Sequence, residues 1–493
     1  MDVFTHTVAL IGVVVIVAAL FSGIIDRTGL PQVVLFLLLG AVLGPAGLGV
    51  VSFTLESGSL KTVAILGLVL VLFTDAVGVD VKSVKQHARL VGRVLGPGTI
   101  ITAALTAGAA WWLLDLSWSA SAILGSALAS TDPVMMRTLL RREEVPPAAR
   151  QALRFESGVN DVVLLPIVLI AMVFMGSDAE LTSQAWSRLG LDLLLLGPGA
   201  GVVAGLVAIA VLDFIRKRFG VRRDYESLYA LGVAFTAYAA AEAVHGSGFL
   251  AAFAAGLTIA ALDVELCDCF LDYGQATAEM FLLFTFVAFG SGLIWQGFSA
   301  ISVPALIFAL IALFIRSAVM WISLTGLSLD AKSRMLIVWF GPRGLSSLLL
   351  VLLPIFAGIG GADALFPVCA LVVLLSVVIH GAMLPVLTRR LGAPPPPPPQ
   401  AGEGSMRPAS PASRQMPVVG DGVANRERVT IDEVRRLWDR GEPVRLLDVR
   451  KDGTWRDSPL QTRGAIRMNP EQPRLIAAEL ALPKHDWLVA YCT

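Results

Sequence analysis

The feature that most constrains this chain is a series of long apolar segments. The first two cover residues 8–25 and 33–51, and each reaches or approaches the ~20 residues that a helix needs to cross a hydrocarbon core about 30 Å thick. Similar segments recur up to residue 390. Within lipid only helices and closed barrels satisfy their own backbone amides, and the strict alternation of a barrel strand is missing here. We therefore predict an all-α, polytopic membrane protein.

The apolar segments and the polar residues between them define about thirteen predicted spans. An odd number of spans puts the two ends of this region on opposite sides of the membrane. No Lys or Arg precedes the first span, so we expect a retained helix and not a cleaved signal peptide. The predicted spans are residues 7–25, 30–51, 59–78, 92–114, 118–139, 153–175, 188–214, 227–244, 247–262, 277–294, 302–325, 333–354 and 363–389.

Lys and Arg are concentrated in every second predicted connection. If the N-terminus is outside, the inside connections hold basic clusters such as those around Arg141, Arg218 and Arg390, whereas the outside connections keep only Lys61 and Arg188. Cytoplasmic loops accumulate Lys and Arg. We therefore predict a multi-pass protein of the inner or plasma membrane, with its N-terminus outside and its C-terminal tail in the cytoplasm.

The composition changes after the last predicted span. Six prolines, Pro394 to Pro399, lead into a stretch rich in Gly, Ser, Ala and Pro, which cannot bury a core. Farther along, one amphipathic-helix pattern and two buried-strand patterns indicate a small α/β fold. We predict three parts: a transmembrane domain (1–392), a disordered linker (393–427) and a tail (428–493).

The tail resembles a rhodanese-like domain through the segments LLDVR, TRGAIRM and AYC. In that family the cysteine at the end of the central strand lies in a loop of backbone N–H groups, which stabilise a thiolate or persulfide. The resemblance makes Cys492 a possible sulfurtransferase nucleophile. Because the sequence stops one residue later, we expect a partial, truncated module that is catalytically idle.

Ionisable side chains inside the predicted spans are few, and each costs ~2.5–3.5 kcal/mol there on insertion scales. Two of them stand beside helix-breaking residues: Asp132 precedes Pro133, and Arg343 follows Pro342 between two glycines. Because such breaks free backbone groups, we predict two discontinuous helices. Those deepest in the predicted spans are Asp75, Asp132, Glu156, Asp161, Glu242, Glu279, Arg316 and Arg343.

The two broken spans occupy corresponding positions if the spans fall into two related halves of opposite orientation. Paired, interrupted helices of this kind mark the midplane site of transporters built from inverted repeats. We therefore predict an inverted repeat in which the two discontinuous helices cross. The alternative is a pair of proline kinks around a buried ion pair, but kinks alone would not place an Asp beside one Pro and an Arg beside the other.

The segment FESGVND gathers polar residues within one of the most apolar regions. Ser157 and Asp161 are four residues apart and so share a helix face. Their oxygens, joined by an oxygen of Thr131, could hold one small cation. A proton and a metal ion would exclude each other at the single carboxylate of Asp161.

The other face of the same segment carries Glu156 and Asn160. We expect Glu156 to pair with Arg343, because an unpaired buried charge is expensive. We expect Asn160 to face Asp132 across the helix crossing and to hold its geometry.

With GAVLGPAGLG and LFTDAVGVD, the motifs TDPV, ESGVND and GPRGL resemble those of monovalent cation/proton antiporters of the sodium/proton exchanger type. The match runs from about residue 7 to 390. The resemblance implies that Asp161 binds either cation or proton, and that Asn160 before it marks the branch associated with electroneutral exchange. It further implies that Thr131, Asp132 and Ser157 are auxiliary cation-site residues. It also implies that Glu156 and Arg343 form a structural ion pair and that Asp75 is the acidic residue near the cytoplasmic funnel.

We therefore expect a secondary antiporter, not an enzyme, that exchanges Na⁺, K⁺ or Li⁺ for H⁺ with alternating access. No phosphate-binding glycine motif is evident, so an ion gradient must supply the energy. We expect no cofactor, no tightly bound metal and no nucleic-acid partner, and the resemblance implies a homodimer in the lipid bilayer. The alternatives are an ion channel, a membrane-tethered sulfurtransferase, and a cation-responsive sensor that signals through the rhodanese-like tail.

Overall fold

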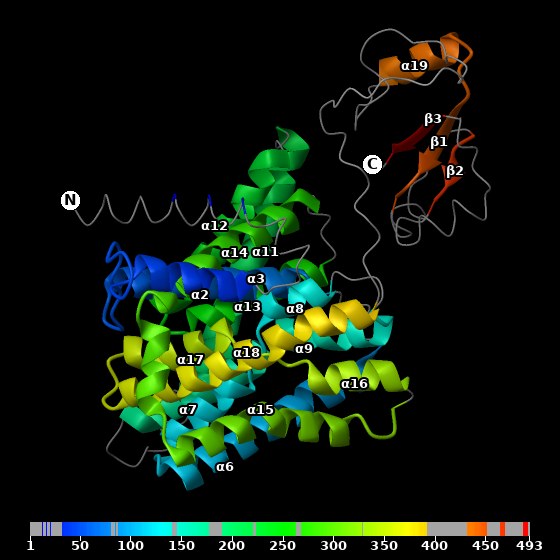
Figure 1. Cartoon of the computed structure of the whole chain (residues 1–493). Helices are drawn as coiled ribbons and strands as arrows, with labels where there is room; N and C mark the ends of the chain where they lie inside the picture. The colour runs from blue at the N-terminus through cyan, green and yellow to red at the C-terminus, as the bar shows by residue number, and fades with distance from the viewer. Residues whose placement is uncertain are drawn as a thin grey trace. The chain divides into compact units, whose positions relative to one another are not determined.

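The structure is a computed structural model, and it forms two compact units, Met1–Pro399 and Gln400–Thr493 (Figure 1). The predicted linker and Cys492 lie outside the described residues, as does nearly all of the predicted first span. The residues described are 12, 16, 20, 32–79, 84, 87–140, 145–176, 190–219, 223–262, 268–327, 329–391, 431–450, 464–468 and 487–491.

The first half of the membrane unit begins with apolar helices that lack charges near their centres. Its elements are α2 (Gln32–Leu43), α3 (Gly58–Val77), α5 (Ala88–Arg93), the π-helical η1 (Val94–Thr99), α6 (Ile100–Leu114), α7 (Trp118–Ala129), α8 (Pro133–Leu140) and α9 (Pro147–Gly176).

The second half continues the helical pattern. Its elements are the π-helical η2 (Leu191–Leu196), α11 (Gly197–Arg218), α12 (Arg223–Ala243), α13 (Gly248–Ala261), α14 (Asp268–Gly290), the 3₁₀-helical η3 (Leu293–Ala300), α15 (Val303–Ser323), α16 (Ala331–Trp339), α17 (Leu345–Phe356), η4 (Ala362–Ala364) and α18 (Leu365–Leu391).

Among the described residues, six helices are long and apolar enough to cross a membrane, and the bent pair Met280–Gly290 and Leu293–Ala300 would make a seventh. A multi-pass helical membrane fold is therefore confirmed. The number of thirteen spans stays a prediction, because several predicted spans are represented by shorter helices. The apolar helices of 10–17 residues are Gln32–Leu43, Leu228–Ala243, Gly248–Ala261 and Leu345–Phe356.

Both helices that the sequence predicts to be discontinuous are broken. Helix α7 ends at Ala129 and α8 begins at Pro133, while α16 ends at Trp339 and α17 begins at Leu345. Ser130 between α7 and α8 has an extended backbone, with φ −63° and ψ 140°. Pro133 suits the first position of a helix, because an amide there has no partner inside the helix.

The core of the membrane unit is aliphatic and aromatic. Helix α3 packs against α13 and α14. The largest fully buried side chains of the core include Phe36, Phe73, Phe286 and Phe289. Gly256 of α13 lies so close to α3 that a Cβ there would overlap the backbone of Phe73. Helix α3 also packs against α9, which carries the polar residues of the predicted site.

The second unit contains α19 (Ile431–Asp439) and three parallel strands, β1 (Val444–Asp448), β2 (Ile466–Arg467) and β3 (Trp487–Tyr491), in the order β2-β1-β3. The predicted helix and both predicted strands are present. The segment TRGAIRM contributes β2, because two of its residues pair with the end of β1. The rhodanese-like assignment stays a prediction.

Candidate functional site

The two helix breaks lie against each other and satisfy each other's backbone groups. The amide of Asp132 donates to the carbonyl of Pro342 over 2.9 Å. The Nη1 atom of Arg343 donates to the carbonyls of Ala129 and Ser130, over 2.8 and 2.9 Å. Helix ends leave carbonyls without a partner inside the helix. The Arg343 side chain therefore supplies the donors that backbone amides would supply if α7 continued.

Close approach at this contact requires glycine at residue 344. A Cβ there would overlap the carboxylate of Asp132. The same carboxylate accepts a hydrogen bond from the amide of Val134 over 3.2 Å and so caps the start of α8. Asp132 therefore stabilises the break and lies beside the backbone of the other broken helix.

Asp161 is buried on α9, with 4% of its surface exposed. Its Oδ1 atom accepts a hydrogen bond from the hydroxyl of Ser130 at the end of α7. The hydroxyl of Ser346 on α17 also interacts with this carboxylate. The carboxylate thus lies between the two breaks, and its nearest hydroxyl is one that the sequence analysis did not single out. The sequence does carry a signal for it, because Ser130 is a hydroxyl-bearing residue directly before the TDP motif.

Asn160 is fully buried, and its side-chain amide donates to the hydroxyl of Thr131 over 2.8 Å. The amide therefore binds the residue directly before Asp132, and the expected position of Asn160 opposite Asp132 itself stays a prediction. The Oδ1 atom of Asn160 has no hydrogen-bond partner within the part of the chain that the structure describes. Two successive residues of the break, Ser130 and Thr131, therefore hold two successive residues of α9.

Ser157 is buried one turn before Asp161, as its spacing predicts. Its hydroxyl donates to the carbonyl of Arg154 in its own helix over 3.3 Å. In this conformation Ser157 therefore stabilises the helix backbone. Its oxygen keeps a free lone pair for a ligand, since a hydroxyl carries one hydrogen and two lone pairs.

The structure pairs Glu156 with Arg316 of α15, so the predicted ion pair of Glu156 with Arg343 is wrong. The Nε and Nη2 atoms of Arg316 donate to the two carboxylate oxygens over 2.7 and 2.6 Å. Arg316 also donates to the carbonyls of Ile337 and Val338 near the end of α16. The physical reason is that the guanidinium of Arg343 binds the carbonyls at the end of α7. The guanidinium of Arg316 can bind both the Glu156 carboxylate and the carbonyls at the end of α16.

Arg343 is fully buried. Among the described residues, its Nε and Nη2 atoms have no hydrogen-bond partner, while Nη1 binds the last carbonyls of α7. A cation is favourable at the C-terminal end of a helix, where the carbonyls give a partial negative charge. Arg343 therefore supplies a fixed positive charge next to Ser130 and close to Asp161.

Asp75 on α3 lies beside the polar face of α9. A Cβ built on Gly158 would be 3.7 Å from the Cβ of Asp75. Gly158 is three residues before Asp161, so Asp75 lies about one helical turn from the buried carboxylate.

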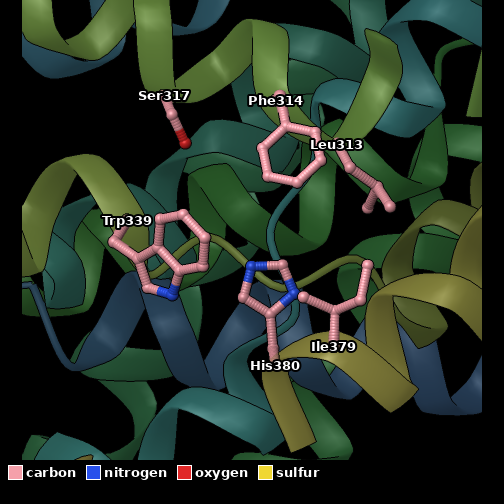
Figure 2. Close-up of a pocket in the computed structure, with 6 residues that line it drawn as sticks. All are labelled: Leu313, Phe314, Ser317, Trp339, Ile379 and His380. Carbon is pink, nitrogen blue, oxygen red and sulfur yellow. The ribbon is translucent and has the colours of Figure 1, made fainter. Parts of the chain in front are cut away.

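A small pocket lies behind the second break, between α15, α16 and α18. In Figure 2 the imidazole ring of His380 lies between the side chains of Trp339 and Ile379, with Phe314 above it. The amide of Arg343 donates to the hydroxyl of Ser376 over 2.7 Å, and Nδ1 of His380 is 3.2 Å from that hydroxyl. Buried polar groups on α18 therefore anchor the backbone of the break. The pocket is lined by Leu313, Phe314, Ser317, Trp339, Ile379 and His380.

Comparison with known proteins gives one family over most of the chain. The family model described as "Sodium/hydrogen exchanger, transmembrane" matches residues 13–390. The K⁺/H⁺ antiporter NhaP of Alkalimonas amylolytica is 25% identical over 471 residues, which are 93% of this chain and 80% of that protein. The K⁺/H⁺ antiporter NhaP2 of Shewanella sp. (strain MR-4) is 27% identical over 377 residues, 76% of this chain and 65% of that protein.

A solved structure has the same fold. The sodium proton antiporter MjNhaP1 from Methanocaldococcus jannaschii at pH 8 aligns with a TM-score of 0.61 and 19% identity, covering 78% of this chain and 100% of that one.

Proposed function

The chain belongs to the sodium/hydrogen exchanger family, and from this premise we propose that it exchanges a monovalent cation for protons at one buried carboxylate, Asp161. It is a transporter and not an enzyme. The cation is Na⁺, K⁺ or Li⁺; the two sequence relatives described above are named as K⁺/H⁺ antiporters, and the solved structure as a sodium proton antiporter. We propose no cofactor, because the exchange needs only the carboxylate and the two transported ions.

One observation carries the site assignment: Asp161 is buried where the two breaks meet, with hydroxyls directed at it. A carboxylate in low dielectric is stabilised by a proton or by a cation. Both ligands use the same oxygens, so binding of one excludes the other. The remaining oxygens of the cation site come from Thr131, Asp132, Ser157 and Asn160.

The stoichiometry proposed is electroneutral. Asn160 occupies the position next to Asp161 and has a neutral amide that holds Thr131. The charges of Glu156 and Arg316 are neutralised by each other. Asp161 is then the group that exchanges one proton for one cation, and no net charge crosses the membrane.

Transport requires that the site open alternately to each side. We attribute this to movement of one helix bundle against another around the crossing breaks, with the two halves related as an inverted repeat. Asp75, about one turn from Asp161, would draw cations into the cytoplasmic funnel. We further propose a homodimer in the inner or plasma membrane, with the N-terminus outside and the rhodanese-like tail in the cytoplasm.

The test uses purified full-length chain in liposomes that contain a pH-sensitive dye and carry an imposed pH gradient. Addition of Na⁺, K⁺ or Li⁺ should dissipate the gradient, and Asp161→Asn should abolish this response. Asp363→Asn, which changes an exposed aspartate, is the matched control and should exchange like the unmodified chain. Unchanged exchange by Asp161→Asn would refute the site, and no exchange of any of the three cations by the unmodified chain would refute the function.

A further inference from the structure

We propose that Ser130 is a specificity-determining residue of this exchange: its hydroxyl takes the place of the cation at Asp161 in the empty site and supplies an oxygen ligand in the loaded one. The inference rests on the proposed function of Asp161. It assigns a role to a residue that neither the TDP motif nor the ESGVND motif includes.

The geometry fixes the backbone of Ser130 and leaves its hydroxyl directed at the carboxylate. Ser130 has no exposed surface and follows the last residue of α7 in an extended conformation. Its carbonyl is held by Nη1 of Arg343 over 2.9 Å. Its hydroxyl donates to Oδ1 of Asp161. One residue therefore connects the end of α7, the fixed charge of Arg343 and the carboxylate.

A serine hydroxyl can serve all three states of the carboxylate, because it has one hydrogen and two lone pairs and rotates freely about its C–O bond. When Asp161 is ionised and no cation is bound, the hydroxyl can donate its hydrogen to Oδ1, the atom that Oγ contacts. When Asp161 is protonated, the carboxyl O–H can donate to Oγ of Ser130. When a cation binds Asp161, the hydrogen turns away and Oγ presents a lone pair to the cation.

The neighbouring Thr131 is less free to do this. Its hydroxyl accepts the amide hydrogen of Asn160 over 2.8 Å, so one of its two lone pairs is already used. A further rotation of that hydroxyl would break the contact. Ser130 is therefore the hydroxyl of the break that can change its role as the ion changes.

Loss of the Ser130 hydroxyl should weaken cation binding and favour the proton. The cation loses one oxygen ligand, and the ionised carboxylate loses a donated hydrogen bond that favours its charged form. Protons then compete better at a given pH. We therefore expect the KM for the cation to rise roughly tenfold at fixed pH, which is the effect of one hydrogen bond to a charged group. The pH at half-maximal exchange should move to a higher value.

The experiment compares Ser130→Ala, Ser130→Thr and Ser121→Ala in full-length chain in liposomes. Ser121 is a buried serine of the same helix α7, and its hydroxyl has no hydrogen-bond partner among the described residues. It therefore controls for loss of a buried hydroxyl as such. Exchange is measured against concentrations of Na⁺ and K⁺ at a series of pH values, and monodispersity is checked by size-exclusion chromatography.

The expected result is a raised KM and an alkaline shift of the pH profile for Ser130→Ala, with the rate at saturating cation retained. Ser130→Thr, which keeps the hydroxyl, should restore the KM and the profile, and Ser121→Ala should match the unmodified chain. The inference is overturned if Ser130→Ala keeps the KM and pH profile of the unmodified chain, or if Ser130→Thr shifts both as far as Ser130→Ala does. Absence of exchange in the unmodified chain would instead refute the proposed function, so the two failures are distinguishable.

Discussion

Arg316 and Glu156 form a buried, bidentate ion pair, with the two guanidinium nitrogens 2.7 and 2.6 Å from the two carboxylate oxygens. Both side chains are almost fully buried. The pair joins α15 to α9, and further hydrogen bonds from Arg316 join both to the end of α16. One guanidinium therefore couples the helix that carries Asp161 to the second break.

The first prediction concerns this pair. Glu156→Gln leaves the Arg316 charge buried without its counter-charge, and breaking a buried pair costs about 3–5 kcal/mol. We expect a clear loss of thermal stability in detergent, measured by fluorescence-detected size exclusion after heating. Glu56→Gln, which neutralises an exposed glutamate, should leave the transition unchanged.

A double-mutant cycle separates the pairing found here from the pairing predicted from sequence. Glu156→Gln and Arg316→Met should show a large coupling energy, because each removes the partner of the other. Glu156→Gln and Arg343→Met should be closer to additive, because Arg343 binds the carbonyls of Ala129 and Ser130. Strong coupling in the second cycle together with none in the first would contradict the pairing.

The third prediction concerns the close contact of the two breaks. Gly344→Ala places a Cβ into the Asp132 carboxylate, and overpacking of this kind costs typically 1–3 kcal/mol. We expect slower exchange together with a lower midpoint of thermal unfolding. Gly108→Ala on α6, where a Cβ meets nothing within 4 Å, is the control for the glycine-to-alanine change itself. Equal behaviour of the two variants would argue against the contact.

The fourth prediction tests the contact of Thr131 with Asn160. Thr131→Val keeps the shape and removes the acceptor, so the buried amide of Asn160 loses its partner at a cost of about 1–3 kcal/mol. Thr131→Ser keeps the hydroxyl. The valine variant should have a lower midpoint of thermal unfolding and a higher KM for the cation. The serine variant should restore both values to those of the unmodified chain. Similar values for the two variants would show that the hydroxyl is not used.

Much of this arrangement can be predicted from sequence because it depends on local chemistry. Pro133 and the Gly341–Gly344 segment place both breaks correctly, since a proline removes a backbone donor and a closely spaced set of glycines and proline disfavours a continuous helix. The spacing of Glu156, Asn160 and Asp161 likewise follows from helix geometry, and all three are buried.

The partner choices could not be predicted, because they depend on how distant helices pack. Two buried arginines, Arg316 and Arg343, could equally serve Glu156 in sequence, and only the packing of α15 against α16 decides between them. The hydroxyl of Ser130 is likewise one of several near the break. Its role depends on the extended backbone that turns it toward Asp161.

The last prediction concerns the tail, where Asp448 accepts hydrogen bonds from Nε and Nη2 of Arg450 over 2.9 and 2.6 Å, and from the hydroxyl of Tyr491 over 3.1 Å. The Arg450 guanidinium holds the pKa of the Asp448 carboxyl below its usual value. A lowered pKa stabilises the folded tail at every pH above the ordinary value of an aspartate, and this contribution disappears as the pH falls through the lowered one.

Hydrogen exchange of β1 amides in the full-length chain measures this contribution. Asp448→Asn should lose protection at pH 7, and its protection factors should change less than those of the unmodified chain between pH 5 and the acid limit, because the titrating group is gone. Asp439→Asn, a change of an exposed aspartate in α19, should behave like the unmodified chain. If Asp448→Asn keeps full protection of β1 at pH 7, the carboxylate contributes nothing to the stability of the sheet.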